Sequence, residues 1–135
     1  MVDLVEREGI YYQKFSDVPF SGKVTGDAQG SVKNGKRDGD WVLHESGQLK
    51  KGNFKNGKRE GTWISYYDNG QLESKGNYKN GKQEGIWVEY WDDGELSTKG
   101  EYKKGKREGA WVSYVFGIVT KADAGTFKDG VKISD

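Results

Sequence analysis

The chain of 135 residues contains no cysteine, one proline and one histidine. The absence of cysteine excludes disulfides, thiolate metal sites and a cysteine nucleophile. A single histidine cannot supply a cluster of histidine ligands for a metal ion. The scarcity of proline favours uninterrupted strands, because proline removes the amide donor that a β-ladder needs.

An excess of charge of either sign is also missing, since 22 Lys and Arg side chains stand against 21 Asp and Glu side chains, for a net charge of +1. No whole-chain field attracts a polyanion, so we expect neither a nucleic-acid partner nor membrane contact. Residues 1–12 carry charges and no long apolar run, which predicts neither a signal peptide nor a membrane span. We expect a cytoplasmic protein, or a periplasmic or membrane-tethered one if a signal segment has been removed.

Aromatic residues and glycine are abundant: 13% of the chain is Phe, Trp or Tyr, and 21 residues are glycine. The aromatic content argues against disorder even though 32% of the residues are charged. Aliphatic residues are too few for a conventional interior, so burial must come from rings that lie on thin sheets. The many glycines indicate many tight turns.

One short sequence recurs four times along the chain, as GKRDGDW, GKREGTW, GKQEGIW and GKREGAW. The tryptophans that close these segments are separated by 22, 24 and 24 residues; they are Trp41, Trp63, Trp87 and Trp111. A fixed period in the twenties indicates a repeat architecture.

Each unit contains two strand-like runs and two turns. A strand begins at the Trp, a turn such as Asp68-Asn69-Gly70 follows, and a second strand leads to Asn80-Gly81 or its equivalent. Glycines before every Trp would break a helix in each repeat, so we predict no helix. The predicted fold is all-β, an elongated array of antiparallel hairpins in a single twisted meander sheet.

Side-chain alternation predicts which residues share a face of this sheet. Trp63, Ser65 and Tyr67 should lie on one face, with Ile64 and Tyr66 on the other. On the second strand of the unit, the same count places Leu72, Ser74, Gly76 and Tyr78 together and Glu73 opposite them, and it groups Leu96 with Thr98 one unit later. Small residues at Gly52, Gly76 and Gly100 should let a Trp of the neighbouring strand cover the backbone.

The two ends depart from the repeat. We interpret residues 1–32 as an N-terminal capping hairpin segment, and residues 33–132 as four repeats that end in an atypical C-terminal cap, all within one continuous domain. Residues 114–119 replace a polar turn by an apolar one. Either Phe116 and Ile118 fold back as a cap, or they form a dimer or partner contact, because exposed apolar edges recruit other chains.

The repeated pattern G-K-x-E/D-G-x-W-x-x-Y, followed by N-G-Q-L and K-G-x-Y/F-K-N, resembles the MORN-repeat variant family of bacterial proteins, often grouped as antitoxin-like. The resemblance covers roughly residues 33–132. It implies consecutive hairpins in one elongated, groove-like sheet that serves as a scaffold or protein-binding platform. The antitoxin label implies a toxin as partner, neutralised by direct contact.

Candidate catalytic residues are few. His44 takes the position that Tyr66 and Tyr90 occupy in later units, which favours a structural ring over a ligand. Recurring carboxylates favour turn stabilisation or pairing with nearby lysines over acid/base chemistry; they are Glu60, Glu84 and Glu108. The GKREG loops lack the spacing of a phosphate-binding loop. We therefore expect no enzyme activity, no catalytic residue, no metal and no cofactor.

Aromatic side chains are the candidate partner-binding residues, because Trp and Tyr dominate interface energetics. The Trp that opens each repeat is expected to be structural, and the predicted partner-binding set is Tyr66, Tyr67, Tyr90, Trp91, Tyr114 and Phe116. We expect these rings to anchor another protein, with a homodimer through the C-terminal edge as a further expectation. A stripe of basic pairs should line one edge of the array and set orientation and on-rate, with Lys58 and Arg59 as one pair. The alternatives are a carbohydrate or cell-wall module and a phospholipid-binding module.

Overall fold

The computed structural model describes residues 3–116, 118–119 and 124–134, and within these ranges it contains strands and no helix. The strands are β1 Leu4–Arg7, β2 Ile10–Gln13, β3 Gly22–Val24, β4 Ala28–Lys33, β5 Lys36–Glu45, β6 Gln48–Lys55, β7 Lys58–Tyr67, β8 Leu72–Lys79, β9 Lys82–Tyr90, β10 Leu96–Lys103, β11 Lys106–Val115, β12 Ile118–Val119, β13 Gly125–Lys128 and β14 Val131–Ser134.

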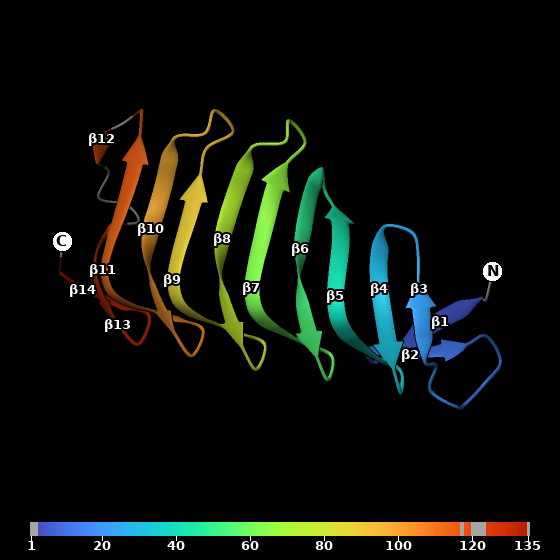
Figure 1. Cartoon of the computed structure of the whole chain (residues 1–135). Helices are drawn as coiled ribbons and strands as arrows, with labels where there is room; N and C mark the ends of the chain where they lie inside the picture. Colours follow the sequence, from blue (N-terminus) through green and yellow to red (C-terminus); the bar gives the residue numbers. More distant parts are fainter. Residues whose placement is uncertain (1–2, 117, 120–123, 135) are drawn as a thin grey trace.

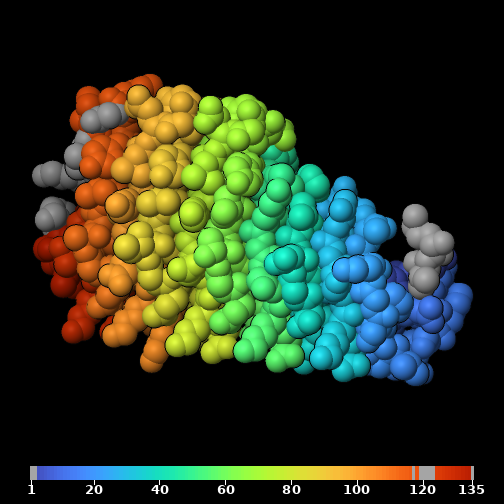
Figure 2. Space-filling view, in the orientation of Figure 1, coloured from blue at the N-terminus to red at the C-terminus, as the bar shows by residue number. Residues whose placement is uncertain are grey.

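Strands β3 to β14 form one 12-stranded antiparallel sheet in which neighbours in sequence are neighbours in space, apart from β12, which pairs with β11 off this path. β1 and β2 form a separate two-stranded sheet. Figure 1 shows a single open, twisted layer with the two termini at opposite ends, and Figure 2 shows the repeats as consecutive bands across the molecule. The prediction of an elongated hairpin array is therefore confirmed.

Two-residue turns join the repeats along one long edge of the sheet. Asn56 and Gly57 have φ angles of 51° and 79°, and Asn80 and Gly81 repeat this pair at 52° and 80°. Two successive positive φ angles make a type I′ turn, whose twist matches that of the flanking strands. The carboxylate of Glu60 accepts a hydrogen bond from the Asn80 amide at 3.0 Å, which ties this turn to the preceding repeat.

The other recurring carboxylates act in the same way. Glu84 accepts from the amide of Lys104 at 2.8 Å, and Glu108 accepts from the amide of Asp129 at 3.0 Å. The prediction that these glutamates stabilise turns is confirmed, and the repeat of the motif follows from the repeat of the turn.

Each repeat Trp lies flat over a glycine of the preceding strand. A Cβ atom built on Gly76 would fall 2.2 Å from the ring of Trp87, so only glycine fits under this ring. The indole of Trp87 also donates to the Asn77 carbonyl at 3.2 Å. The same covering recurs at Gly52 under Trp63, as predicted.

The covering Trp rings alternate with rings from the second strands, and together they form one continuous row. The rings of Trp63 and Tyr78 lie 6.2 Å apart, and those of Tyr78 and Trp87 lie 5.4 Å apart, both edge to face. Edge-to-face pairs contribute about 0.5–1.5 kcal/mol each beyond their burial. The whole row is Tyr11, Trp41, Phe54, Trp63, Tyr78, Trp87, Tyr102, Trp111 and Phe127.

One part of the predicted face assignment is wrong. Leu72 lies opposite Tyr66, on the face away from the Trp rings, because the register shifts between Ser65 and Tyr66. The extra residue, Glu73, turns its carboxylate to the Trp side and accepts from the Ser65 hydroxyl at 2.9 Å. A β-bulge thus moves each side chain beyond it to the other face.

The next repeat has the same bulge. There Leu96 lies opposite Tyr90, and the register shifts between Leu96 and Thr98. Leu96 therefore leaves the face on which simple alternation grouped it with Thr98.

The ring row ends differently at the two ends of the chain. Near the N-terminus Tyr11 stacks on Trp41 with ring centroids 6.2 Å apart, and Arg37 donates to its hydroxyl at 3.0 Å. Near the C-terminus Phe127 closes the row against Trp111. Phe116 is 92% exposed and Ile118 is 70% exposed, so the prediction that they fold back as a cap is wrong.

Candidate functional site

The face that carries the continuous ring row, called the Trp face here, is occupied by the protein's own side chains. Trp41 is 1% exposed and Trp111 is 4% exposed. An arginine four residues earlier covers three of these rings; the Arg59 guanidinium, for example, lies 4.4 Å from the Trp63 ring centre. The repeat Trp rings are therefore structural, as predicted, and they offer little surface to a partner.

The arginine of each basic pair, such as Arg59, was predicted to belong to a basic stripe along one edge of the array. The guanidinium groups of Arg37 and Arg107 instead stack over Trp41 and Trp111, at 4.6 and 4.3 Å from the ring centres. The third repeat has Gln83 at this position. The spacing R-x-x-x-W was the signal in the sequence, because a cation and a ring on one strand four residues apart lie on the same face.

The opposite face is called the open face. It carries a row of alternating rings and leucines along one side: His44, Leu49, Tyr66, Leu72, Tyr90, Leu96 and Tyr114. Tyr66, Tyr90 and Tyr114 are half-buried. Within the described residues, no second sheet or helix covers this face over β6 to β10. The tyrosine rings on these strands are therefore available to another molecule.

A second row on the open face runs beside the first. Its members alternate between a β-branched residue and a lysine on successive strands: Val42, Lys51, Ile64, Lys75, Val88, Lys99 and Val112. The three lysines are exposed, and the Val and Ile side chains between them are half-buried. This row was not predicted, although the recurring dipeptide Lys-Gly at period 24 was its signal in the sequence.

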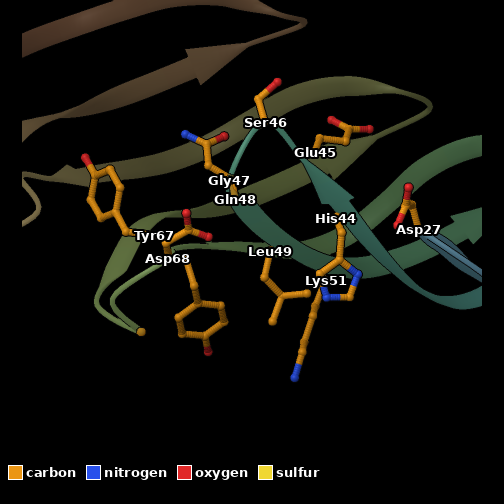
Figure 3. Close-up of a pocket in the computed structure, with 12 residues that line it drawn as sticks. Asp27, His44, Glu45, Ser46, Gly47, Gln48, Leu49, Lys51, Tyr67 and Asp68 are labelled. Atoms are coloured by element: carbon orange, nitrogen blue, oxygen red, sulfur yellow. The ribbon is translucent and has the colours of Figure 1, made fainter.

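One hollow lies toward the N-terminal part of the sheet, between the C-terminal ends of β5 and β7 and the N-terminal end of β6. It measures about 580 Å³, and its lining includes His44, Leu49, Lys51, Tyr66 and Asp68. Figure 3 shows His44, Leu49 and Lys51 pointing to one side of the sheet and Tyr67 to the other. The hollow thus opens beside the first Tyr of the open face.

Tyr67 and Trp91, two predicted partner-binding residues, lie instead at the edge of the Trp face. The Tyr67 hydroxyl donates to the Tyr90 carbonyl at 2.7 Å, and the Trp91 indole donates to the Tyr114 carbonyl at 2.9 Å. Each ring therefore bridges to the next hairpin. A hollow of about 380 Å³ separates them, with Ser74 and Thr98 among its lining.

This hollow is acidic. Burial raises the pKa of the Tyr67 hydroxyl above its ordinary value, and the negative charges of Glu73, Asp92 and Glu89 raise it further. Beside it, Trp91 also lines a smaller hollow of about 210 Å³ together with Phe116. Phe116 thus lies near Trp91 and apart from the tyrosines of the open face.

The six predicted residues therefore do not form one site. Tyr66, Tyr90 and Tyr114 share the open face, whereas Tyr67, Trp91 and Phe116 follow the acidic edge. Within the described ranges, no group of three or more His, Asp or Glu side chains could hold a metal ion. Across the same ranges, we find no helix that is long and apolar enough to span a bilayer.

The hairpin geometry agrees with a known repeat. The sequence profile described as MORN repeat variant matches residues 59–80 and 83–104. The chain contains repeats of the MORN type. The first match covers almost all of the β7–β8 hairpin and the second that of β9–β10, so one MORN unit corresponds to one hairpin with its following turn. MORN repeats generally serve as binding modules and are typically non-catalytic.

Other comparisons add little. No curated protein matches the chain. Among solved structures, a crystal structure of an S. aureus TarM mutant in complex with fondaparinux, alpha-GlcNAc-glycerol and UDP is 15% identical and has a TM-score of 0.41. The alignment covers 83% of this chain and 19% of that one. A likeness this weak carries no argument about function.

Proposed function

We propose that this protein is a non-catalytic protein-binding module whose open face receives the partner. The supporting observation is the contrast between the faces. Every repeat Trp is buried in the ring row. Tyr66 and Tyr90, by contrast, are half-buried on a face that no described element covers over β6 to β10, and the half-buried Tyr114 continues their row on β11.

The open face suits recognition of a protein for two physical reasons. Tyrosine supplies a large contact area with few rotatable bonds, so little conformational entropy is lost when it is immobilised. The strands that carry these rings are held on both sides by continuous ladders, so the surface is preformed and its ordering has been completed on folding.

The biological form that we propose is an antitoxin-like inhibitor or a scaffold, acting by direct contact in the cytoplasm. Neither form requires a reacting group on this chain. An inhibitor needs a rigid face that blocks a surface of its partner, and a scaffold needs one that holds its partners together. A continuous sheet provides such a face.

A carbohydrate is the second candidate, because the hollow beside Tyr67 and Trp91 combines ring faces with hydroxyls and carboxylates. In that case the ligand would bind at the acidic edge rather than on the open face. Variants of the two faces therefore separate the two candidates.

The test is affinity purification of the tagged protein from its native source, followed by mass spectrometry. The wild type is compared with Tyr66→Ala/Tyr90→Ala, and with Phe15→Ala/Val18→Ala, which removes two exposed apolar side chains from the segment between β2 and β3. Circular dichroism checks that all three are folded. We expect a stoichiometric protein that the Tyr variant loses and the control retains. Absence of any protein, with retention of glycan instead, would contradict the proposal.

A further inference from the structure

We infer that the open face receives an acidic, amphipathic helix of its protein partner, whose carboxylates meet the row of Lys51, Lys75 and Lys99. This inference rests on the proposed function and specifies the partner's chemistry. It follows from the spacing of the three lysines, from their lack of ion-pair partners among the described residues and from the apolar row beside them.

The spacing comes from the register of the sheet. Lys75 lies opposite Ile64 on one neighbouring strand and opposite Val88 on the other. Lys51 and Lys99 occupy the equivalent positions two strands away on either side. Because adjacent strands lie about 4.8 Å apart, successive lysines are about 9.6 Å apart along a line that crosses the strands.

None of the three ammonium groups forms an ion pair with another described residue. Lys50, which is next in sequence but lies on the Trp face, pairs with Glu45 at 3.4 Å. The row of Tyr and Leu and the row of the lysines contain no carboxylate. The next row on the open face, on the far side of the lysines, carries five: Asp40, Glu60, Glu84, Glu101 and Glu108. Three of them already accept hydrogen bonds from turn amides; they are Glu60, Glu84 and Glu108. The part of a ligand that meets the three lysines is therefore anionic, and it lies on the side toward the tyrosines, away from the row of carboxylates.

The tyrosine and leucine row adds a second requirement. Tyr66 lies two residues beyond Ile64 on the same strand, about 6.7 Å away. A ligand that covers both rows must therefore present an apolar stripe next to an acidic one. An amphipathic segment of a protein has this character.

The periodicity selects a helix over an extended strand. In a helix, residues i, i+7 and i+14 lie on one face about 10.5 Å apart, which is close to the lysine spacing. In a strand, side chains on one face repeat about every 6.7 Å, so successive carboxylates would drift away from the lysines. From Lys51 to Lys99 the row spans about 19 Å, and the carboxylates at i, i+7 and i+14 of a helix of about 15 residues span about 21 Å.

A membrane fits these features less well. Juxtamembrane lipid-binding segments carry clusters of about four to eight basic residues, and this row has three. The Val and Ile side chains between the lysines are half-buried and do not protrude as inserting groups. Binding to a membrane is therefore the alternative that the experiment below also tests.

The test compares two triple charge reversals that change the net charge equally. The first is Lys51→Glu/Lys75→Glu/Lys99→Glu. The control is Lys55→Glu/Lys79→Glu/Lys103→Glu, on the same three strands four residues nearer to the two-residue turns. All six side chains are exposed, so both variants should fold, which circular dichroism verifies.

The probe is a capped helical peptide with Glu at i, i+7 and i+14 and Leu at the i+3 and i+4 positions after each, titrated into labelled protein and followed by amide NMR shifts. A peptide of the same composition with the glutamates out of this spacing is its control. We expect shifts around Lys51, Lys75 and Lys99, binding weakened at least about tenfold by the first reversal, and little change from the second. No binding, or equal weakening by both reversals, would overturn the inference.

The captured partner separates this inference from the proposed function. The inference is supported if the captured partner no longer binds the Lys51→Glu/Lys75→Glu/Lys99→Glu protein. Changing the acidic residues of the partner's helix to lysine should then restore binding to that variant. A partner that the first reversal retains overturns the helix and leaves protein binding standing, whereas the absence of any partner removes the proposed function. Lysine-dependent sedimentation with phosphatidylserine vesicles, without peptide binding, would assign the row to membranes.

Discussion

The two faces of this sheet carry the same kinds of residue and use them differently. On the Trp face, Trp63 and Trp87 each contact a ring on either side and are almost fully buried. On the open face, Tyr66 and Tyr90 are half-buried and have no ring contact with a described residue. Aromatic content alone therefore does not distinguish a core from a binding surface.

The residue on the neighbouring strand makes the difference. Trp87 lies over Gly76, where the bare backbone lets the indole lie flat and reach a carbonyl. Tyr66 lies between Leu49 and Leu72, whose side chains occupy the space beside it. A sheet of one layer thus obtains a core on one face from glycine and ring pairs, and keeps the other face for a partner.

The largest expected effect comes from removing one ring of the row. Trp87→Ala should lower the free energy of unfolding by about 3–5 kcal/mol, because it removes a buried ring and its contacts to Tyr78 and Tyr102. The matched control is Trp91→Ala, since Trp91 is 42% exposed. Urea denaturation measures both, and equal losses would contradict the claim that the buried ring row, rather than any Trp of this face, carries the stability.

The next largest effect on stability should come from replacing the glycine under the Trp87 ring. Gly76→Ala should cost about 1–3 kcal/mol, because its Cβ would overlap the Trp87 ring and force it away from the strand. Ser74→Ala, two residues earlier on the same strand, should cost less. A Gly76→Ala protein as stable as the wild type by thermal unfolding would show that the ring does not need the bare backbone.

The hydrogen bond from Tyr67 at the acidic edge should contribute less to the free energy of unfolding. Tyr67→Phe removes the hydrogen bond to the Tyr90 carbonyl and should cost about 0.5–1.5 kcal/mol at neutral pH. The folded state raises the pKa of Tyr67, so it holds this proton more tightly than the unfolded chain does. The wild type should therefore lose stability as the pH rises above about 10, and the variant should lose less. If the free energy of unfolding changes with pH in the same way for the two proteins, this assignment is contradicted.

The smallest expected effect is an increase in stability. Gln83→Arg places a guanidinium where Arg59 and Arg107 cover their Trp rings, and should stabilise the third repeat by about 0.5–1 kcal/mol. Gln83→Met is the control, because it supplies an apolar stem without the charge. If both variants are equally stable in urea, the arginines act by packing alone.

The sequence predicted the parts of the fold that local chemistry determines. The Asn-Gly turns, the strands between them and the glycines under Trp all follow from residues close together in the chain. The face assignment of Leu72 and Leu96 was wrong, because alternation assumes a regular strand and no residue type marks the bulge beside them.

The site was predicted less well, because it depends on neighbours that only the register identifies. Alternation correctly placed Tyr66 and Tyr90 on the face opposite the Trp rings, and Tyr67 and Trp91 on the same face as them. The predicted partner-binding set nevertheless combined residues of both faces. Tyr67 and Trp91 lie at the edge of the Trp face and bridge to the next hairpin. The lysine row escaped prediction because its members lie on different strands and become a row only when the strands pair.

The most direct test of the division between the two faces is the free energy of unfolding of Tyr66→Ala/Tyr90→Ala/Tyr114→Ala. If these rings serve a partner, each contributes about 0.2–1 kcal/mol as a cross-strand neighbour, so the three together should cost less than Trp87→Ala alone. A loss equal to or larger than that of Trp87→Ala would show that the open face is a second core, and would contradict its assignment as the binding surface.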